Sequence, residues 1–198
     1  MADLSGRILL STRWAQSSDG GFVYNAYCPL DPQTGNRSLV GCVGLMHAQI
    51  LYYWAEQGYD LTLTLASSDA YTTATRHITI TGEADAATGC PSFTEINAQL
   101  APLSTGTGDI AALCYACGVL PHSDYTASAT SAQLTLDVYD RAGFASSLVV
   151  SNTAHPFFFT VDGSTNILTE AGRQVVRENL QEGLVVASPT YLMESVSQ

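Results

Sequence analysis

The sequence contains no lysine, and few of its residues are charged. All seven basic residues are arginine and stand against 18 acidic residues, which gives a formal net charge of -11. Because polyanions repel an acidic surface, this charge argues against a nucleic acid or an anionic membrane as partner. With 46% hydrophobic residues in a chain of 198, the protein can bury a core, which excludes wholesale disorder.

Long apolar runs and internal repeats are also missing. No run approaches the roughly 18 apolar residues that a bilayer-spanning helix needs, so we expect no membrane span. No fixed period supports a collagen, coiled-coil or repeat fold, and no glycine-rich loop indicates phosphate binding. No linker forces a division of the chain, and we interpret residues 1–198 as a single domain.

A second CxxC pair is absent as well. The number of cysteines is five, and an odd number does not fit a disulfide framework. Cys114 and Cys117 have CxxC spacing, but a zinc site of this kind would need another pair. Since Ile110 and Leu113 fall on the same helical stripe, we interpret both cysteines as core residues. We expect no metal and no cofactor.

Hydrophobic periodicity predicts helices in the first two thirds of the chain and more strand character near its end. Helices are predicted over 41–57, from Pro91 to Leu100, over 109–117 with Gly118 as the stop, over 131–142 with Gly143 as the stop, and from Thr169 to Leu180. Residues 61–65 and 78–81 alternate with period two and predict the paired strands of a hairpin, and 184–187 predict a buried strand. This order indicates an α+β fold and not alternating βαβ units.

Cys42 is the strongest candidate for chemistry. It follows Gly41 at the start of the most apolar predicted helix, where backbone N–H groups and the helix dipole favour an anion. A cysteine there favours its thiolate form, which is a nucleophile. From position alone, a small buried residue at a helix start remains the alternative. Gln16 carries a side-chain amide that can stabilise an oxyanion beside such a thiolate, together with the Cys42 N–H.

Three stretches of the sequence carry a family pattern. They are Leu9 to Gln16 with Leu-Leu…Trp-x-Gln, Tyr24 to Pro29 with Tyr-Asn-x-x-Cys-Pro, and Gly41 to Trp54 with Gly-Cys-Val and Ala-Gln. They resemble the start of the mature streptopain-type cysteine peptidases, which are papain-like bacterial enzymes. A later stretch from Ile110 to Ser128 also fits, and the resemblance runs from about residue 8 to residue 190.

The resemblance implies a papain-like α+β fold. Its helical lobe, about residues 30–145, would carry the nucleophile helix, followed by the start of an antiparallel sheet lobe that is incomplete in this chain. It further implies a thiol endopeptidase acting on a peptide or protein substrate. Cys42 matches the nucleophile of the family, Gln16 its oxyanion-hole donor and Gln49 a structural residue. Family members are generally exported, so we expect a secreted or cell-surface protein.

The catalytic histidine of this family is not identified in the chain. The family supplies it in a Gly-His…Asp-Gly strand, after the strand that corresponds here to residues 183–186. His47 lies five residues after Cys42, which is about 140° round the helix, and His155 precedes the Thr169 helix instead of following it. His77 and His122 lie in no such context either. We therefore expect the histidine from a segment or a second polypeptide after residue 198.

Other interpretations remain open at this point. A shortened chain, or a natural remnant that binds without catalysing, also fits the missing histidine. The protein would then be a non-catalytic binding module with Cys42 in its core. A papain-like amidase or acyltransferase is a further alternative, because cysteine, histidine and glutamine serve any acyl transfer.

Overall fold

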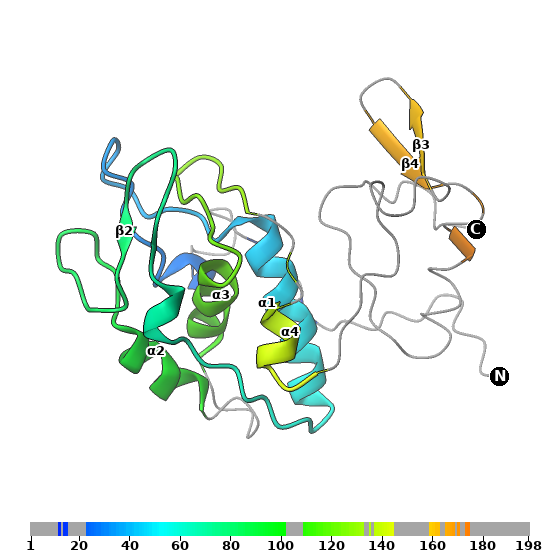
Figure 1. Cartoon of the computed structure of the whole chain (residues 1–198), viewed down its shortest axis with the longest axis horizontal. Helices are drawn as coiled ribbons and strands as arrows, with labels where there is room; N and C mark the ends of the chain where they lie inside the picture. Colours follow the sequence, from blue (N-terminus) through cyan, green and yellow to red (C-terminus); the bar gives the residue numbers. More distant parts are fainter. Residues whose placement is uncertain are drawn as a thin grey trace. The chain divides into compact units, whose positions relative to one another are not determined.

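The computed structural model describes residues 12, 14–15, 23–101, 109–132, 135, 137–144, 159–162, 165–168, 170 and 173–174. The chain divides into two compact units. One comprises Leu10–Ser146, and the other comprises Met1–Leu9 with Ser147–Gln198. The helices described below belong to the first unit, and one hairpin belongs to the second (Figure 1).

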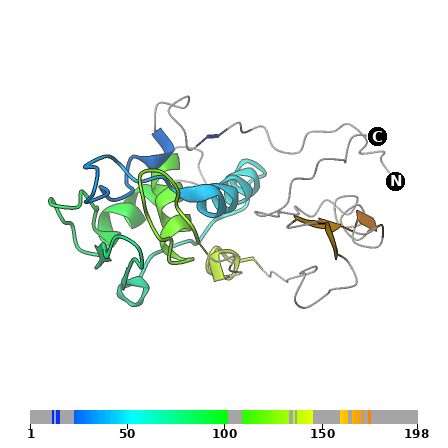
Figure 2. The same cartoon turned by 90° about the horizontal axis from the view of Figure 1, so that it is seen from above.

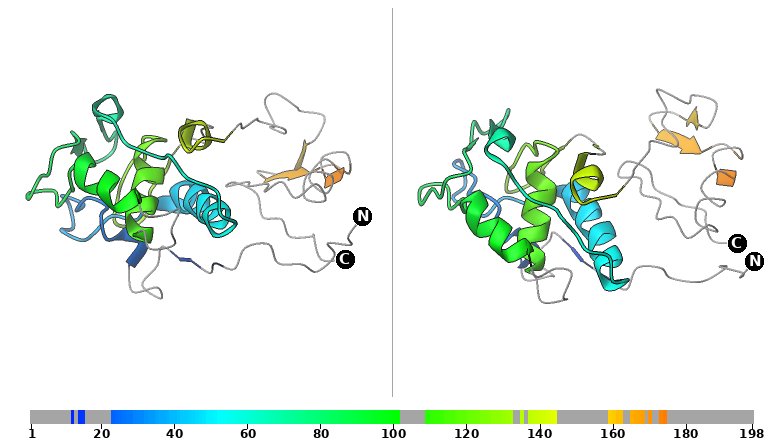
Figure 3. Two further views of the ribbon diagram at one scale, coloured as in Figure 1. Left: turned by 90° about the horizontal axis from the view of Figure 1, so that it is seen from below. Right: turned by 60° about the horizontal axis from the view of Figure 1, so that its bottom comes forward.

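Three helices form the centre of the first unit: α1 (Gly41–Glu56), α2 (Phe93–Leu100) and α3 (Ile110–Val119). α3 packs against both others and lies between them (Figure 3). Every residue from Ala111 to Val119 is buried, as expected for a helix that is apolar on all sides. The short 3-10 helix η2 (Val23–Asn25) also packs on α3. The helix predicted over 41–57 is confirmed almost to the residue.

The close approach of α1 and α3 depends on two glycines. A Cβ placed on Gly44 of α1 would lie 3.2 Å from the Cα of Gly118 in α3. A Cβ on Gly118 would itself collide with the hydroxyl oxygen of Tyr125. The prediction that Gly118 ends this helix is therefore wrong. The residue lies inside α3 and is small because two neighbours crowd it, and the two helices lie side by side in Figure 2.

α2 begins with a capping box. The N–H of Glu95 donates to the Ser92 hydroxyl at 3.1 Å, and the N–H of Ser92 donates to the Glu95 carboxylate at 2.8 Å. These two bonds satisfy backbone donors that the helix itself leaves unpaired. Phe93, Ile96 and Leu100 point into the core, so the helix predicted from Pro91 to Leu100 is confirmed, although it begins two residues later.

The predicted hairpin between residues 61–65 and 78–81 is wrong in its pairing. The two-residue strand β2 (Thr79–Ile80) pairs antiparallel with β1 (Tyr71–Thr72), in the register Tyr71↔Ile80. Residues 61–65 do alternate between buried leucine and exposed threonine, but they form no strand. Instead the N–H of Leu65 donates to the Asn97 side chain at 2.8 Å, and that amide donates back to the Leu65 carbonyl at 2.9 Å.

The helix predicted over 131–142 is much shorter in the structure. α4 spans Asp137–Arg141, whereas Ser131 forms an isolated antiparallel bridge with Asp124. That pairing holds residue 131 in extended backbone, so a helix cannot begin there. Gly143 follows α4 with φ +88°, which fits its predicted role as the stop. The Arg141 guanidinium forms a salt bridge with the carboxylate of Asp69 in η3 (Ser67–Asp69), with 2.7 Å between Nη2 and Oδ1.

The described part of the second unit contains an antiparallel hairpin of β3 (Phe159–Asp162) and β4 (Thr165–Leu168), in the register Phe159↔Leu168. Most of the helix predicted from Thr169, and the strand predicted over 184–187, lie outside the described residues. Helices with small antiparallel pairs agree with the predicted α+β class. In the described part of the chain, no helix is both long enough and apolar enough to cross a membrane.

Candidate active site

Cys42 is the second residue of α1 and is exposed to solvent. The other four cysteines, Cys28, Cys90, Cys114 and Cys117, are free and buried. Burial raises the pKa of each of these four thiols. All five cysteines are described, so Cys42 is the one thiol that a solvent-borne electrophile can reach without an opening of the fold.

The first turn of α1 has no side-chain cap beside this thiol. Its N-cap residue is Val40, which supplies no side-chain acceptor, and the first turn contains no acidic residue. The initial N–H groups of a helix have no partner within the helix, and together with the helix dipole they stabilise an anion. They can therefore stabilise a negatively charged oxygen that forms close to Cys42.

Long-range contacts hold the backbone just before Cys42. The N–H of Val40 donates to the buried side chain of Asn25 at 2.8 Å. The N–H of Leu39 donates to the carbonyl of Thr126 at 3.0 Å, and the Thr130 hydroxyl donates to the Leu39 carbonyl at 2.7 Å. Asn25 and the segment of Thr126 and Thr130 thus together fix the direction in which the chain enters α1.

Gly41 has a backbone conformation that other residues rarely adopt. Its φ is +84°, and a Cβ there would lie 3.0 Å from the methyl carbon and 3.1 Å from the carbonyl oxygen of Thr130. A side chain at this position would be strained by the backbone and crowded by Thr130. Glycine is therefore required at the residue that brings the chain to Cys42.

The predicted core role of the CxxC pair is confirmed. Cys114 and Cys117 are both fully buried in α3, among apolar neighbours. In the residues that the structure describes, no group of three or more histidine, cysteine, aspartate or glutamate side chains could hold a metal ion.

His47 is buried and bonds a residue of α4. Its Nδ1 lies 2.8 Å from the hydroxyl oxygen of Tyr139 in α4, and no protein group bonds its Nε2. Burial lowers the pKa of His47 to about 4, which keeps the ring neutral at pH 7. His77 and His122 are exposed turn residues with φ 53°. No hydrogen bond joins these three rings to Cys42, and His155 lies outside the described residues.

Gln16 also lies outside the described residues, so its predicted place beside Cys42 stays a prediction. The residues just before it are partly described. Trp14 stacks on Tyr24 with ring centroids 5.3 Å apart and contacts Tyr52 of α1 at 5.1 Å. The Thr12 hydroxyl donates to the Gln49 side chain at 2.8 Å, which gives Gln49 the structural role expected for it.

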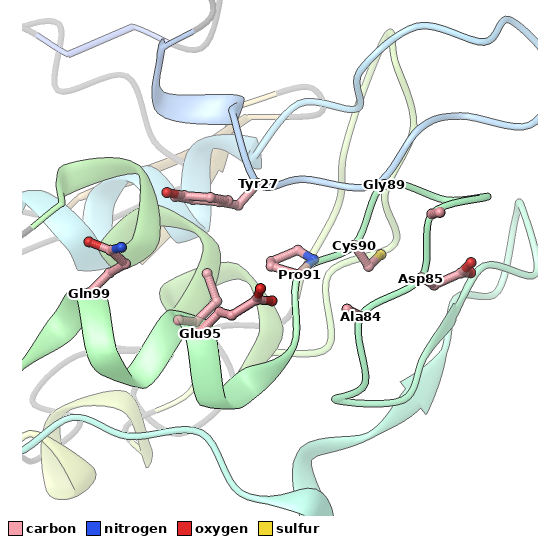
Figure 4. A pocket seen from close by; sticks show the side chains of 10 residues that line it. Tyr27, Ala84, Asp85, Gly89, Cys90, Pro91, Glu95 and Gln99 are labelled. Carbon is pink, nitrogen blue, oxygen red and sulfur yellow. The ribbon is translucent and has the colours of Figure 1, made fainter.

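A surface hollow of about 490 Å³ lies beside α2 (Figure 4). The side chains of Tyr27, Asp85, Cys90 and Glu95 are part of its wall. Its carboxylates already accept local hydrogen bonds, Asp85 from its own turn and Glu95 from the α2 cap. Cys42 does not line this hollow, so it is not the binding cleft of the candidate nucleophile.

Sequence reasoning missed the residues that support Cys42. Asn25 lies in the Tyr-Asn-x-x-Cys-Pro stretch, but that pattern assigns no role to its side-chain amide. Thr130 lies in a run of small polar residues that suggests only a loop. The sequence does not indicate that the Asn25 side chain is buried close to Gly41, because this proximity arises only in the folded chain.

Two of three comparisons with known proteins found nothing: neither a curated protein nor a solved structure matches the chain. The sequence pattern of the Peptidase C10 family does match, over residues 14–186, and these residues include Cys42 and its supporting loop. This match covers most of the 198 residues. The chain therefore belongs to the Peptidase C10 family, the streptopain family of cysteine peptidases.

Proposed function

We propose that the protein is a thiol endopeptidase in which Cys42 is the nucleophile. The observation that carries the proposal is the position of this thiol. It is the one exposed cysteine of the chain, at a helix start without a side-chain cap, in a family of cysteine peptidases. The alternative of a buried core residue at position 42 conflicts with its exposure.

The proposed reaction begins at this thiol. The Cys42 thiolate adds to the peptide carbonyl carbon, and the carbonyl π electrons move to oxygen. The Cys42 N–H, with the Gln16 side-chain amide, stabilises that oxyanion. When the intermediate collapses, the C–N bond breaks and an imidazolium gives its proton to the leaving amine. Water then hydrolyses the thioester and regenerates the thiol.

The histidine for this step and the extent of the domain are further parts of the proposal. We propose that residues 1–198 form a papain-like catalytic domain without its histidine-bearing sheet portion, with a helical lobe over about 30–145. The histidine comes from a segment or second polypeptide that follows residue 198. Family members are typically secreted, and we propose a secreted or cell-surface location for this protein as well.

Site-resolved alkylation tests the nucleophile without needing the histidine. The folded protein is treated with iodoacetamide at pH 7, and each cysteine is quantified by peptide mass mapping over time. We expect Cys42 to react at least about 100-fold faster than the four buried cysteines. Those thiols react only after an opening of the fold, and an opening free energy of about 3 kcal/mol gives this factor. Equal labelling of all five would overturn the proposal.

Activity is tested on the protein together with its histidine-bearing polypeptide. Casein hydrolysis should be lost in Cys42→Ala and kept in Cys90→Ala, the matched control, because Cys90 is buried at 6% exposure. Unchanged hydrolysis in Cys42→Ala would reject the role of nucleophile. Offering amines to the trapped acyl-enzyme separates a peptidase from an acyltransferase, since a transferase gives the amide in preference to the acid.

A further inference from the structure

We propose that the loop of residues 126–130, anchored by the buried carboxylate of Asp31, is a positioning device that sets the reactivity of Cys42. This inference rests on the proposed function, because it deepens the role given there to Cys42. The contacts of the loop with the chain before α1 are made to Leu39 and Gly41. The loop acts through the three residues that precede the nucleophile.

The loop holds both backbone groups of Leu39. Its N–H donates to the Thr126 carbonyl at 3.0 Å, and its carbonyl accepts the Thr130 hydroxyl at 2.7 Å. Thr130 also backs onto Gly41, where a Cβ would lie 3.0 Å from its methyl carbon. The loop thus fixes the chain immediately before Cys42 by two hydrogen bonds and one close packing contact.

The loop is rigid enough to do this because it is bonded to itself. The Thr126 hydroxyl donates to the Ala129 carbonyl at 2.6 Å and accepts the Ala129 N–H at 2.9 Å. The Thr126 N–H donates to the Thr130 hydroxyl oxygen at 3.2 Å. A loop closed by three such bonds loses little further freedom when it binds α1, so Thr130 stands preorganised.

Asp31 ties this loop to the rest of the unit. Its side chain is buried, and one carboxylate oxygen accepts the Ala127 N–H at 2.9 Å. The other oxygen accepts the Gln33 N–H at 2.9 Å and the Arg76 guanidinium at 3.0 Å. Removing any of these donors would leave a buried charge partly unpaired, which costs free energy, so all three hydrogen bonds are kept and fix the position of the groups that donate them. The anchor of the loop is therefore stiff.

The chemical consequence lies at the first turn of α1. The N–H groups of this turn can stabilise negative charge beside Cys42 only while they keep their direction, and no side chain caps them. If Leu39 loses its carbonyl partner, this turn can rotate or fray, and the reacting group at Cys42 loses those donors. We expect a loss of about tenfold in the reactivity of Cys42 at pH 7, the size of one weakened hydrogen bond.

Two substitutions at Thr130 separate its hydroxyl from its methyl group. Thr130→Val keeps the methyl against Gly41 and removes the hydrogen bonds of the hydroxyl to the Leu39 carbonyl and from the Thr126 N–H, whereas Thr130→Ser keeps both. The readout is the alkylation rate of each cysteine by iodoacetamide at pH 7 in the folded full-length chain. We expect Cys42 to react about tenfold more slowly in Thr130→Val and within about twofold of the parent rate in Thr130→Ser.

The buried cysteines give the control for a merely structural effect. A variant that only loosens the fold would speed the labelling of Cys28 and Cys117, while a positioning effect slows Cys42 and leaves them unchanged. Asp31→Asn, which cannot accept both the Ala127 and Arg76 bonds in the same way, should slow Cys42 in the same direction. Circular dichroism shows which variants fold. If Asp31→Asn does not fold, the comparison of Thr130→Val with Thr130→Ser tests the inference.

Several results would overturn the inference. They are a Thr130→Val protein in which Cys42 reacts at the parent rate, a Thr130→Ser protein as slow as Thr130→Val, and faster labelling of the buried cysteines in Thr130→Val. Failure of the proposed function looks different. In that case Cys42 of the parent protein reacts no faster than N-acetylcysteine at the same pH, whatever residue stands at position 130.

Discussion

Acid should destabilise this protein through His47, and a substitution there should remove that sensitivity. The ring is fully buried in α1, with one nitrogen against the Tyr139 hydroxyl and the other without a protein partner. A proton on this second nitrogen would place a charge in the core with no acceptor. This is why burial lowers the pKa of His47 to about 4 from an ordinary value of 6.5.

The sign and size of the effect follow from linkage. Below pH 6.5 the unfolded chain binds a proton at His47 that the folded chain refuses, so folding stability falls as the pH falls towards 4. The stabilisation is fully present above pH 6.5. Each pKa unit is worth about 1.4 kcal/mol, so about 2 kcal/mol is lost between pH 7 and pH 5, and about 3 kcal/mol once the pH is below 4.

Urea unfolding at pH 7, 6 and 5 measures this loss in the parent and in His47→Gln. Glutamine stays neutral and can still bond Tyr139, so the variant should not lose this stability in acid. The free energy of unfolding of the parent, relative to that of His47→Gln, should therefore fall by about 2 kcal/mol between pH 7 and pH 5. His77→Gln is the matched control, since it makes the same substitution at an exposed histidine. Carboxylates titrate equally in all three proteins. A parent-to-variant difference that stays constant from pH 7 to pH 5 would refute the reasoning.

Two further changes test the packing and capping of the helices. Gly118→Ala should lower the free energy of unfolding by about 1–3 kcal/mol, because the new methyl collides with the Tyr125 hydroxyl. Adding Tyr125→Phe should recover much of it in a urea titration, and a double variant no more stable than Gly118→Ala would contradict the collision. Ser92→Ala should cost about 1 kcal/mol by removing the cap of α2, whereas Ala98→Ser on its exposed face should not. Equal urea midpoints for these last two would argue against the cap.

The sequence was most informative where a helix has both an apolar pattern and a clear boundary. The start of α1 follows from Gly41, and its last residue, Glu56, lies one residue before the predicted end. α2 follows from its three apolar residues, Phe93, Ile96 and Leu100, and from Pro91 before them. In both cases the local signal and the tertiary packing agree, so the pattern alone was sufficient.

Prediction failed where a local pattern has more than one structural cause. The alternation of leucine and threonine over 61–65 reflects burial of one side of the segment. A β-strand shows this pattern, and so does an extended segment that a single side chain holds in place. Here that side chain is Asn97, which bonds both the N–H and the carbonyl of Leu65. Gly118 was likewise interpreted as a stop, but glycine also occurs where helices touch. Only the position of Tyr125 and Gly44 distinguishes the two cases.

The candidate site divides in the same way between local and long-range causes. Cys42 can be found from residue type and helix position because both lie within a few residues of sequence. Thr130 bonds a residue 91 positions earlier, and Asn25 bonds one 15 positions later, so no periodicity links them to the thiol. A cysteine on an unsupported helix start would have donors that fray within the first turn, whereas this one has its approach fixed from two separate segments. We propose that this support, and not the cysteine alone, suits position 42 to the role of nucleophile.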